Sequence, residues 1–363
     1  MKEVALKLLK EIEDYGYKAY IVGGFVRDYL LGIESKDIDI TTDATPMELK
    51  EIFEDSLLPN EDYGSVIVFK NNIRFEITTF RMEINYSDNR HPMEVKYIDD
   101  LYQDLLRRDF TINTICMDSN GEIIDLLHGR DDLDNRIIRT VGDSDLKLSQ
   151  DALRILRAIR FATILDFNLD SCVVNSIHNN KHLLKTLSYN RKKEELEKIF
   201  VSSNAKKGIS LLLDFGLDVE LELNNLDKVT STDSLIGIWS VLDVGDIYPF
   251  TSNEKELITK IREAFKYNNL DPYVLYKYDL YVNSVAGDIK GIDKKDITKA
   301  YNELVIKSKS DLDITSQDIM DVLNREPGEY LKDIYDDIII EVLYKRLENK
   351  KEKIVSYILS KYS

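Results

Sequence analysis

Apolar and polar positions follow two different periodicities along this chain, one typical of β-strands and one typical of helices. Before about residue 125, short apolar or alternating stretches occur at 19–24 (AYIVGG), 36–42 (KDIDITT), 65–71 (SVIVFKN) and 74–81 (RFEITTFR). Their β-branched residues and their alternation predict β-strands, because such side chains suit a half-buried pleated surface. The first part of the chain is therefore expected to contain a sheet.

Helical spacing interrupts these strands. FVRDYLLG, at 25–32, ends in a glycine that can stop a helix. A second helix is expected after Thr45, with Thr45 as N-cap, Pro46 as first residue and Glu48 completing a capping box. The polar stretch EINYSDNRHPMEV, at 83–95, is expected to be a long loop. Together these elements predict a small α/β domain whose sheet has a mostly exposed face.

From about residue 129 the strand signals nearly vanish. Long segments keep the spacing of an amphipathic helix, as in DALRILRAIRFATIL, RKKEELEKIFVSS, ELITKIREAFKY and DIYDDIIIEVLYKRLENKKEKIVSYIL. REPGEYL, at 325–331, predicts a turn. The remainder of the chain is therefore expected to be almost entirely helical.

Length and composition are typical of a soluble globular protein of two or more domains. The chain has 363 residues, 43% hydrophobic and 32% charged, and no apolar run reaches the ~20 residues of a membrane span. Residues 1–17 read as an amphipathic helix and not as a secretory signal. Cys116 and Cys172 lack metal-site spacing and are expected to be buried, reduced thiols of a cytoplasmic protein.

The formal net charge of −17 would disfavour a polyanionic partner if the charge were evenly spread, but it is not. Residues 181–210 hold eight basic and three acidic residues, and residues 341–363 hold six basic and three acidic residues. Such segments can dock a phosphate backbone, or they can be ordinary solvated helix faces.

The stretch KDIDIT contains the first candidate chemistry. In a strand its two isoleucines would be buried on one side, and Asp37 and Asp39 would stand together on the other. Two adjacent carboxylates repel unless a positive charge lies between them, and Mg²⁺ prefers one or two carboxylates plus water and phosphate oxygens. Upstream, Gly23 and Gly24 allow backbone N–H groups to approach a phosphate at the start of a helix. We therefore expect Mg²⁺ at the two aspartates, close to a bound phosphate.

Arginines and one further acid supply the other candidates. Arg107 and Arg108, in LLRRDFTINT, offer planar forks for phosphate oxygens, although a surface pair is the plainer interpretation. Glu76 is a candidate third carboxylate on a neighbouring strand, or else a residue salt-bridged to Arg74 or Arg81. QDALRILRAIR places four charged side chains three residues apart along one helix, which predicts either a ligand surface or salt bridges between helices: Asp151, Arg154, Arg157 and Arg160.

Taken in order, these motifs resemble those of a known family. Their order resembles that of the bacterial class II tRNA nucleotidyltransferases, the CCA-adding enzymes of the nucleotidyltransferase and poly(A) polymerase superfamily. The motifs that carry the resemblance are, in order, GGFVRD, KDIDITTDATP, FEITTFR, RRDFTIN, DLLHGRDDLDNRIIRTVGD, DALRILRAIRFA and SYNRKKEELEKIF. The resemblance covers residues 18–200 almost continuously. The C-terminal half is similar only in being helical and in the turn EPGEYL.

The resemblance implies an α+β nucleotidyltransferase head with a five-stranded mixed sheet, followed by an all-α neck, body and tail in a seahorse-like shape. We assign residues 1–128 to the catalytic head, 129–200 to the base-recognising neck, 201–270 to the body and 271–363 to a tRNA-binding tail. It further implies a cytoplasmic, Mg²⁺-dependent enzyme, monomeric or homodimeric. Its partners would be CTP, ATP and the acceptor stem and elbow of tRNA. No association with a membrane is expected.

The family's functional residues carry over motif by motif. Asp37 and Asp39 match the catalytic, metal-binding carboxylates. The nucleotide-binding residues would be Gly23, Gly24, Arg27, Arg108, Asp151, Arg154, Arg157 and Arg160. Within this group, Asp151 and Arg154 would serve as the template for the incoming base.

Hydrogen-bond chemistry supports such a template. A carboxylate accepts from the exocyclic amine of cytosine or adenine, but faces a carbonyl oxygen on uracil or guanine. An arginine donates to the adjacent ring nitrogen, which is unprotonated in cytosine and adenine and protonated in the other two bases. The RNA 3′-hydroxyl would then attack the α-phosphorus and release pyrophosphate, with metals at the two aspartates.

Two positions depart from the family pattern. Gln150 replaces an acid that steadies the template arginine, so base discrimination could be looser. Asn190 replaces a glutamate and, with Arg191, would shape the neck without touching the chemistry. The stretch at 80–95, absent from relatives that add only CC, favours addition of CCA or of A alone. A poly(A) polymerase and an RNA-binding protein on a decayed scaffold remain the alternatives, although the intact aspartate pair disfavours the latter.

Overall fold

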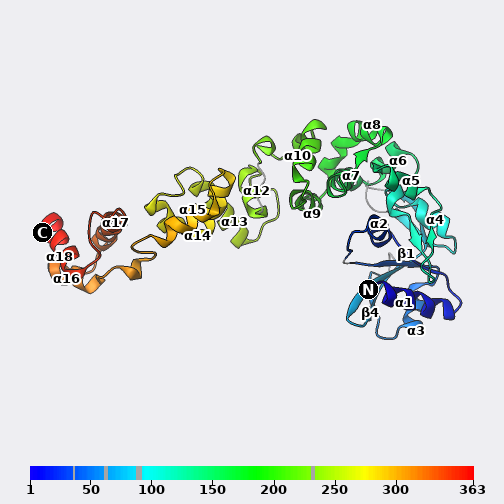
Figure 1. Ribbon diagram of the computed structural model, residues 1–363, viewed down its shortest axis with the longest axis horizontal. Helices are drawn as coiled ribbons and strands as arrows, with labels where there is room; N and C mark the ends of the chain where they lie inside the picture. Colours follow the sequence, from blue (N-terminus) through cyan, green and yellow to red (C-terminus); the bar gives the residue numbers. More distant parts are fainter. Residues whose placement is uncertain (36, 61–63, 87–91, 230–233) are drawn as a thin grey trace. The chain divides into compact units, whose positions relative to one another are not determined.

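The computed structural model describes residues 1–35, 37–60, 64–86, 92–229 and 234–363. They form two compact units, Met1–Glu222 and Leu223–Ser363, which we describe separately (Figure 1). Within the described ranges, no helix is both long and apolar enough to cross a membrane. The finer division into head, neck, body and tail remains a prediction.

A mixed sheet forms the centre of the N-terminal part of the first unit. Among the described residues it has seven strands in the order β3-β4-β5-β2-β1-β8-β9. Only β2 and β5 pair in parallel; the other neighbours are antiparallel. The strands are β1 (Ala19–Val22), β2 (Asp39–Thr42), β3 (Leu57–Asn60), β4 (Ser65–Lys70), β5 (Ile73–Thr79), β8 (Cys116–Met117) and β9 (Ile123–Ile124).

The expected α+β head is confirmed, with two strands more than the five expected. The additional strands, β8 and β9, have two residues each and are too short to produce a periodic pattern. Helices α1 (Lys2–Asp14) and α3 (Pro46–Ile52) pack against β1 and β4 (Figure 1). The capping box predicted at Thr45 and Glu48 is present at the start of α3.

The polar stretch at 83–95 is not the long loop that its composition predicts. Strands β6 (Arg81–Tyr86) and β7 (Pro92–Tyr97) form an antiparallel pair in which Arg81 faces Tyr97. The ladder of hydrogen bonds joins backbone groups, so a polar sequence can also adopt it. Residues 87–91 lie outside the described residues, and so does His91.

The rest of the first unit is helical, as predicted, apart from one short parallel strand pair, β10 (Ile137–Ile138) with β11 (Asn168–Leu169). Its helices are α2 (Gly24–Leu31), α4 (Leu101–Leu106), the 3₁₀ helix η2 (Thr111–Asn113), α5 (Gly129–Asp134), α6 (Ser144–Gln150), α7 (Leu153–Ile164), α8 (Ser171–Asn180), η3 (Lys181–Thr186), α9 (Tyr189–Phe200), α10 (Ala205–Asp214) and α11 (Leu217–Glu220). Helix α7 is largely buried and packs against α9 and α10.

Apart from an isolated β-bridge between Asn224 and Asp243, the regular elements described in the second unit are helices, as the spacing predicts. It contains η4 (Leu226–Lys228), α12 (Leu235–Val241), α13 (Ser252–Ala264), α14 (Pro272–Ile289), α15 (Lys294–Asn302), η5 (Lys309–Asp311), α16 (Ser316–Leu323), α17 (Tyr330–Leu343) and α18 (Lys351–Tyr362). One apolar core joins α13 and α14, and another joins α16, α17 and α18. The EPGEYL turn connects α16 to α17.

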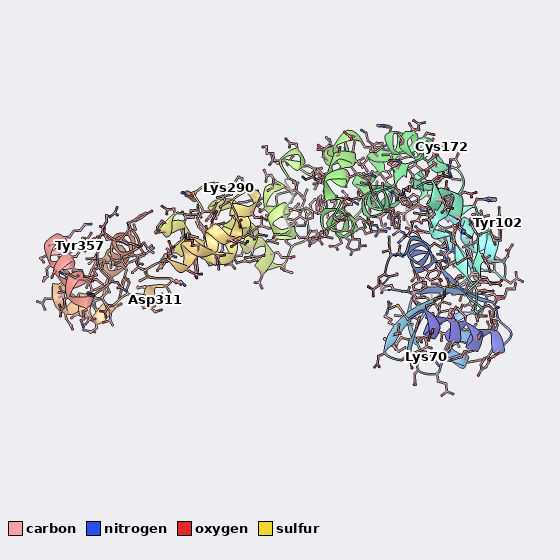
Figure 2. All side chains as sticks on the ribbon, viewed as in Figure 1. Lys70, Tyr102, Cys172, Lys290, Asp311 and Tyr357 are labelled. Carbon is pink, nitrogen blue, oxygen red and sulfur yellow. The ribbon has the colours of Figure 1, made fainter. Side chains whose placement is uncertain are left out.

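The two cysteines differ in their surroundings. Cys116 lies in β8 and is completely buried, and burial raises the pKa of its thiol to about 12. Cys172 is exposed, contrary to expectation (Figure 2). It occupies the first turn of α8, which turns Val173 and Ile177 toward the core and leaves Cys172 on the other side. Both thiols are free.

Candidate active site

A cavity of about 710 Å³ in the first unit brings all of the predicted site residues together. Its lining includes Gly23, Gly24, Arg27, Asp37, Asp39, Arg108, Asp151, Arg154, Arg157 and Arg160. Residues separated by more than 100 positions in the sequence therefore face one space. Their individual roles remain a prediction.

The glycine pair forms the turn between β1 and α2. Gly23 has φ 80° and ψ −130°, a backbone conformation that side-chain-bearing residues rarely adopt. A Cβ atom at Gly23 would also lie 3.7 Å from Nη1 of Arg108. The turn thus places the N-terminus of α2, with its free N–H groups, at the cavity wall beside a guanidinium.

The two aspartates keep the alternation that the sequence predicts, but they do not share a strand. Strand β2 begins at Asp39, and Asp37 lies in the segment before it. Both aspartates are exposed, while Ile38 and Ile40 are buried. Lys36, the residue before them, lies outside the described residues.

Negative charge surrounds Asp39. Its partner in the parallel register is Glu76 of β5, which forms the expected ion pair with Arg74 at 3.3 Å; a role as third carboxylate remains a prediction. Although Asp39 is open to the cavity, the surrounding protein atoms displace water from its carboxylate, and this desolvation raises its pKa; Arg108 lowers the pKa, and the carboxylates of Glu76 and Asp37 raise it. Two carboxylates at the rim of an arginine-rich cavity fit a hard divalent cation. In the part of the chain that the structure describes, no group of three His, Cys, Asp or Glu side chains is arranged to hold a metal.

Asp104, which sequence reasoning missed, anchors the arginine pair. Its carboxylate is fully buried and lies 2.8 Å from Nη2 of Arg107 and 3.4 Å from Nη2 of Arg108. Burial alone would raise the pKa of Asp104, but the two guanidiniums outweigh burial and hold it below its ordinary value. The Nε of Arg108 is buried without a hydrogen-bond partner. The available signal was spacing, since Asp104 precedes the arginines by three and four residues in the LYQDLLRR stretch.

A chain of hydrogen bonds crosses the cavity wall from α2 to α7. Asp28 accepts from Nε and Nη2 of Arg27, at 2.9 and 2.7 Å, and Nη1 of Arg27 donates to Asn113 at 2.8 Å. Asn113 donates to Asp109, which also accepts from Arg157 at 2.7 Å. Burial opposes ionisation of Asp109, but Arg157 and the hydrogen bonds lower its pKa to about 2. The arginines of this wall are therefore held in place before any ligand binds.

Phe161 is the aromatic centre of the same wall. The guanidinium carbons of Arg27, Arg157 and Arg160 lie 5.2, 5.4 and 4.5 Å from the centre of its ring. These are cation–π distances. The cluster places three positive charges around one ring. In the sequence Phe161 looks like an ordinary core residue of α7, and nothing there marks it as part of a site.

Asp151 and Arg154 flank the start of α7 and have separate partners. Asp151 accepts from the backbone N–H of Leu153 at 3.1 Å and from Nη2 of Arg191 at 3.5 and 3.4 Å. Arg154 donates to the carbonyl oxygens of Lys147 and Arg107, at 2.9 and 3.3 Å. Main-chain acceptors thus steady Arg154, although the residue at position 150 is an uncharged glutamine.

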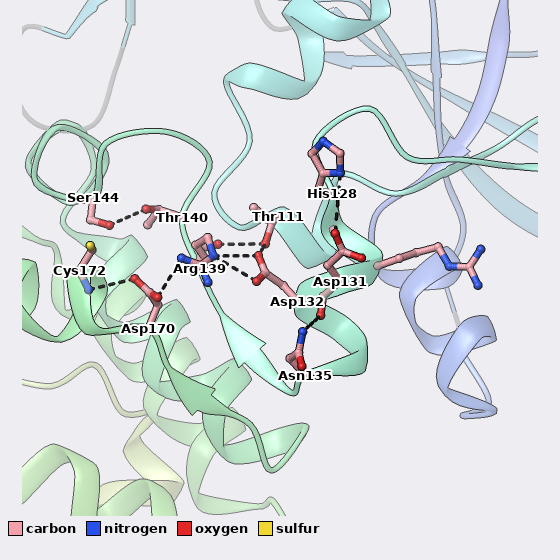
Figure 3. Close-up of polar contacts among 12 residues, drawn as sticks. Thr111, His128, Asp131, Asp132, Asn135, Arg139, Thr140, Ser144, Asp170 and Cys172 are labelled. Carbon is pink, nitrogen blue, oxygen red and sulfur yellow. Dashed lines mark hydrogen bonds and ion pairs between the residues drawn. The ribbon is translucent and has the colours of Figure 1, made fainter.

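A second polar network joins α5, η2 and α8 (Figure 3). Arg139 is held between Asp132 of α5, at 3.1 Å, and Asp170, the N-cap of α8, at 2.9 Å. Asp132 also accepts from the hydroxyl of Thr111 in η2 at 2.7 Å. The network fixes α5, η2 and α8 to one another. Because Asn113 follows in η2, it also supports the cavity wall.

The basic segment at 181–210 does not present a free cationic surface. Lys192 is buried, with its ammonium 4.3 Å from the ring centre of Tyr189. Most of the other bases form ion pairs, namely Lys185–Glu220, Arg191–Asp151, Lys193–Glu197, Lys198–Glu195 and Lys207–Asp166. The surplus of bases in the sequence was real, but acids from other elements neutralise most of it.

Comparison with known proteins gives matches along the whole chain. The family model of the Poly A polymerase head domain matches residues 19–139, and that of the probable RNA and SrmB-binding site of polymerase A matches residues 166–220. The model of the putative tRNA nucleotidyltransferase domain 2 matches residues 248–358. The three matches follow one another without overlap.

Individual relatives agree. The chain is 33% identical to the CCA-adding enzyme of Staphylococcus epidermidis over 98% of this chain and 97% of that one. It is 34% identical to the CCA-adding enzyme of Bacillus pumilus, over 98% of this chain and 96% of that one. Its structure matches the crystal structure of the Bacillus stearothermophilus CCA-adding enzyme in complex with CTP, with a TM-score of 0.83, 27% identity and coverage of 98% and 96%. This chain is a nucleotidyltransferase and belongs to the family of CCA-adding enzymes.

Proposed function

We propose that this protein adds CCA to the 3′ end of tRNA, using CTP and ATP and no nucleic-acid template. The observation that carries the proposal is the single cavity that holds both the aspartate pair and the Asp151–Arg154 pair. A transferase that must choose bases by itself needs its metal-binding and base-reading groups around one nucleotide. The relatives named as CCA-adding enzymes support the same function.

Membership of the nucleotidyltransferase family implies a divalent metal. We propose Mg²⁺, held by Asp37 and Asp39. When bound, it would activate the RNA 3′-hydroxyl and neutralise charge on the departing pyrophosphate. Glu76 lies beside Asp39 and would add negative charge to the site, even though its carboxylate also forms an ion pair with Arg74.

The triphosphate would lie against the glycine turn. Gly23 and Gly24 let the phosphate oxygens approach the backbone N–H groups at the start of α2. Arg108 is held by Asp104 and Arg27 by Asp28, so both guanidiniums are already oriented when the triphosphate arrives. Preorganised donors of this kind stabilise developing charge without a reorganisation cost.

The base would be read by Asp151 and Arg154. The carboxylate accepts from the amine of cytosine or adenine, and the guanidinium donates to the neighbouring ring nitrogen. Uracil or guanine would set a carbonyl oxygen against the carboxylate and leave both groups unsatisfied, at a cost of roughly 1–3 kcal/mol each. Arg157 and Arg160 would fix the position of α7 through Asp109 and Glu195.

The RNA acceptor would be tRNA, with its acceptor stem at the head and its elbow on the helical tail. We propose a cytoplasmic enzyme, in keeping with its two free thiols. The proposed parts are a head (1–128), neck (129–200), body (201–270) and tail (271–363).

The test is incorporation of labelled CTP and ATP, with Mg²⁺, into tRNAs that lack one, two or three 3′-terminal nucleotides. The proposal predicts two cytidines and one adenosine on the shortest tRNA, and adenosine alone on the longest. Incorporation of adenosine alone on every substrate would instead identify an A-adding enzyme. An absence of incorporation would leave an RNA-binding protein as the better description.

A further inference from the structure

We infer that Arg191 is a positioning residue for base selection, which holds the Asp151 carboxylate in the orientation that admits cytosine and adenine. The inference rests on the proposed function, because it assigns a determinant of specificity to the same site. In the sequence Arg191 is one basic residue in a basic helix and is expected only to shape the neck.

Arg191 reaches Asp151 from outside the cavity. Asp151 lines the cavity and Arg191 does not. The Nη2 atom of Arg191 lies 3.5 and 3.4 Å from the two carboxylate oxygens, and both side chains are mostly shielded from water, with 21% and 18% of their surfaces exposed. In the described residues, Arg191 is the side chain that forms an ion pair with Asp151. It can therefore orient the carboxylate without occupying the space of a base.

The two groups of the proposed template are held independently of each other. Arg154 is occupied by the carbonyl oxygens of Lys147 and Arg107, so it does not orient Asp151. Residue 150 is a glutamine, whose uncharged side chain cannot form an ion pair with Asp151 or Arg154. Besides Arg191, the side chain of Asp151 accepts from the backbone N–H of Leu153, at one oxygen only. Removal of Arg191 would leave the carboxylate with that single tether and free to rotate.

Helix α9 is fixed well enough to make Arg191 a reliable support. Glu195, one turn after Arg191 on the same face, forms an ion pair with Arg160 of α7 at 3.2 Å. Two ion pairs of opposite polarity therefore connect α9 with the segment that begins at Asp151, one at each end of a helical turn. In one pair the base is on α9, and in the other the acid is on α9, so a shift of α9 along α7 would bring like charges together. The two ion pairs therefore fix the register between α9 and α7.

One donor of Arg191 remains unused. Its Nη1 is buried and has no hydrogen-bond partner, although buried guanidinium donors are normally satisfied. Nη2 alone serves both oxygens of Asp151 at distances that are long for a charge-assisted bond. A small shift to the two-pronged arrangement would satisfy Nη1 and shorten both contacts. The free protein thus leaves room for this support to tighten when a base occupies the cavity.

The experiment compares binding and incorporation of CTP and UTP by the full-length protein and its variants. Arg191→Gln removes both the positive charge and the planar guanidinium, while Arg191→Lys keeps the charge but not the guanidinium. Lys193→Gln is the matched control, because Lys193 lies two residues further along α9 and pairs with Glu197 of the same helix. Affinities for CTP and UTP are measured by calorimetry without RNA, and incorporation is measured on a tRNA that lacks its three terminal nucleotides.

We expect Arg191→Gln to lower the preference for CTP over UTP at least tenfold, Arg191→Lys to lower it less, and Lys193→Gln to leave it unchanged. In an Asp151→Asn background Arg191→Gln should have no further effect on preference, because the group that it positions is already altered. A preference unchanged in Arg191→Gln, or lowered equally in Lys193→Gln, would overturn the inference. Failure of the unmodified protein to incorporate either nucleotide would overturn the proposed function instead, and the CTP and UTP affinities would still decide the role of Arg191.

Discussion

Asp39 of β2 lies directly beside Glu76 of β5, as neighbours across the only parallel strand pair of the described sheet. Adjacent parallel strands are ~4.8 Å apart, so the two carboxylates share one electrostatic environment. Desolvation by the surrounding protein and the nearby acids together raise the pKa of Asp39, while Arg108 and Arg74 lower it. Asp39 thus has carboxylates as neighbours, and carboxylates are the ligands that a hard divalent cation prefers.

Replacement of Asp39 should separate catalysis from RNA binding. Asp39→Ala is expected to abolish nucleotide transfer, because it removes one of the two proposed metal ligands. Affinity for tRNA should stay within about tenfold, since contacts with the phosphate backbone dominate RNA binding. Transfer rates and filter-binding affinities measure the two effects.

Glu76 provides the matched comparison in that experiment. If Glu76 acts with Asp39, Glu76→Gln slows transfer and Arg74→Gln does not. Equal effects of the two variants would show that the Arg74–Glu76 ion pair matters only for the strand. Retained turnover in Asp39→Ala would remove the metal-site claim altogether.

Asp151→Ala should relax base choice more than it weakens triphosphate binding. The variant loses the acceptor for the base amine but keeps the glycine turn, Arg27 and Arg108. Steady-state kinetics with CTP and UTP should show a smaller ratio of kcat/KM values, with a modest change in affinity for CTP. Asp134→Ala, at an exposed aspartate of α5, is the control. Unchanged discrimination in Asp151→Ala would refute the template.

Asp109 should make stability dependent on pH. Arg157 and hydrogen bonds lower its pKa to about 2 in the folded protein, below the ordinary value near 4. A lowered pKa stabilises the fold above the unfolded value, and this contribution disappears as the pH falls from about 4 toward 2. The two-unit difference corresponds to on the order of 2 kcal/mol.

Urea unfolding at several pH values tests this linkage. The difference in unfolding free energy between the unmodified protein and Asp109→Asn should be largest at neutral pH and should shrink below about pH 4. Asp134→Asn should show no such trend. A difference that stayed constant from pH 7 to pH 3 would contradict the assignment.

Gly129 should be intolerant of even a methyl group. A Cβ atom there would lie 2.3 Å from the carbonyl oxygen of Thr111 and 2.9 Å from Cγ1 of Ile115. Gly129→Ala would push α5 away from η2 and should destabilise the protein by about 1–3 kcal/mol, the usual range for overpacking.

Gly142→Ala is the contrasting variant for a thermal melt. No atom lies within 4 Å of the position of its Cβ, so it meets only the strain of a positive φ of 75°. That strain costs roughly 1–2 kcal/mol. A larger loss of stability in Gly142→Ala than in Gly129→Ala would argue against tight packing of α5 on η2.

Local features were well predicted from the sequence. The capping box of α3, the glycine turn after β1 and the burial of Ile38 and Ile40 depend on neighbouring residues only. The predicted site residues all line one cavity, since their order follows a known family pattern. By contrast, the hairpin β6–β7 depends on backbone pairing, which its polar side chains do not reveal.

Tertiary partners account for what the sequence could not provide. Asp109 and Glu195 are ordinary acids in the sequence, and only the fold sets them against arginines. For the same reason the sequence left open whether the basic surplus at 181–210 docks a phosphate backbone, and the structure pairs most of its bases with acids. Lys192, which composition would place in solvent, is instead buried beside Tyr189.

The most direct measurement is the sequence of the 3′ ends made from a tRNA without CCA, incubated with all four nucleoside triphosphates at equal concentration and Mg²⁺. Our account predicts that nearly every extended end reads CCA and that extension stops there. Ends that carry uridine or guanosine, or tails of adenosine alone, would contradict it.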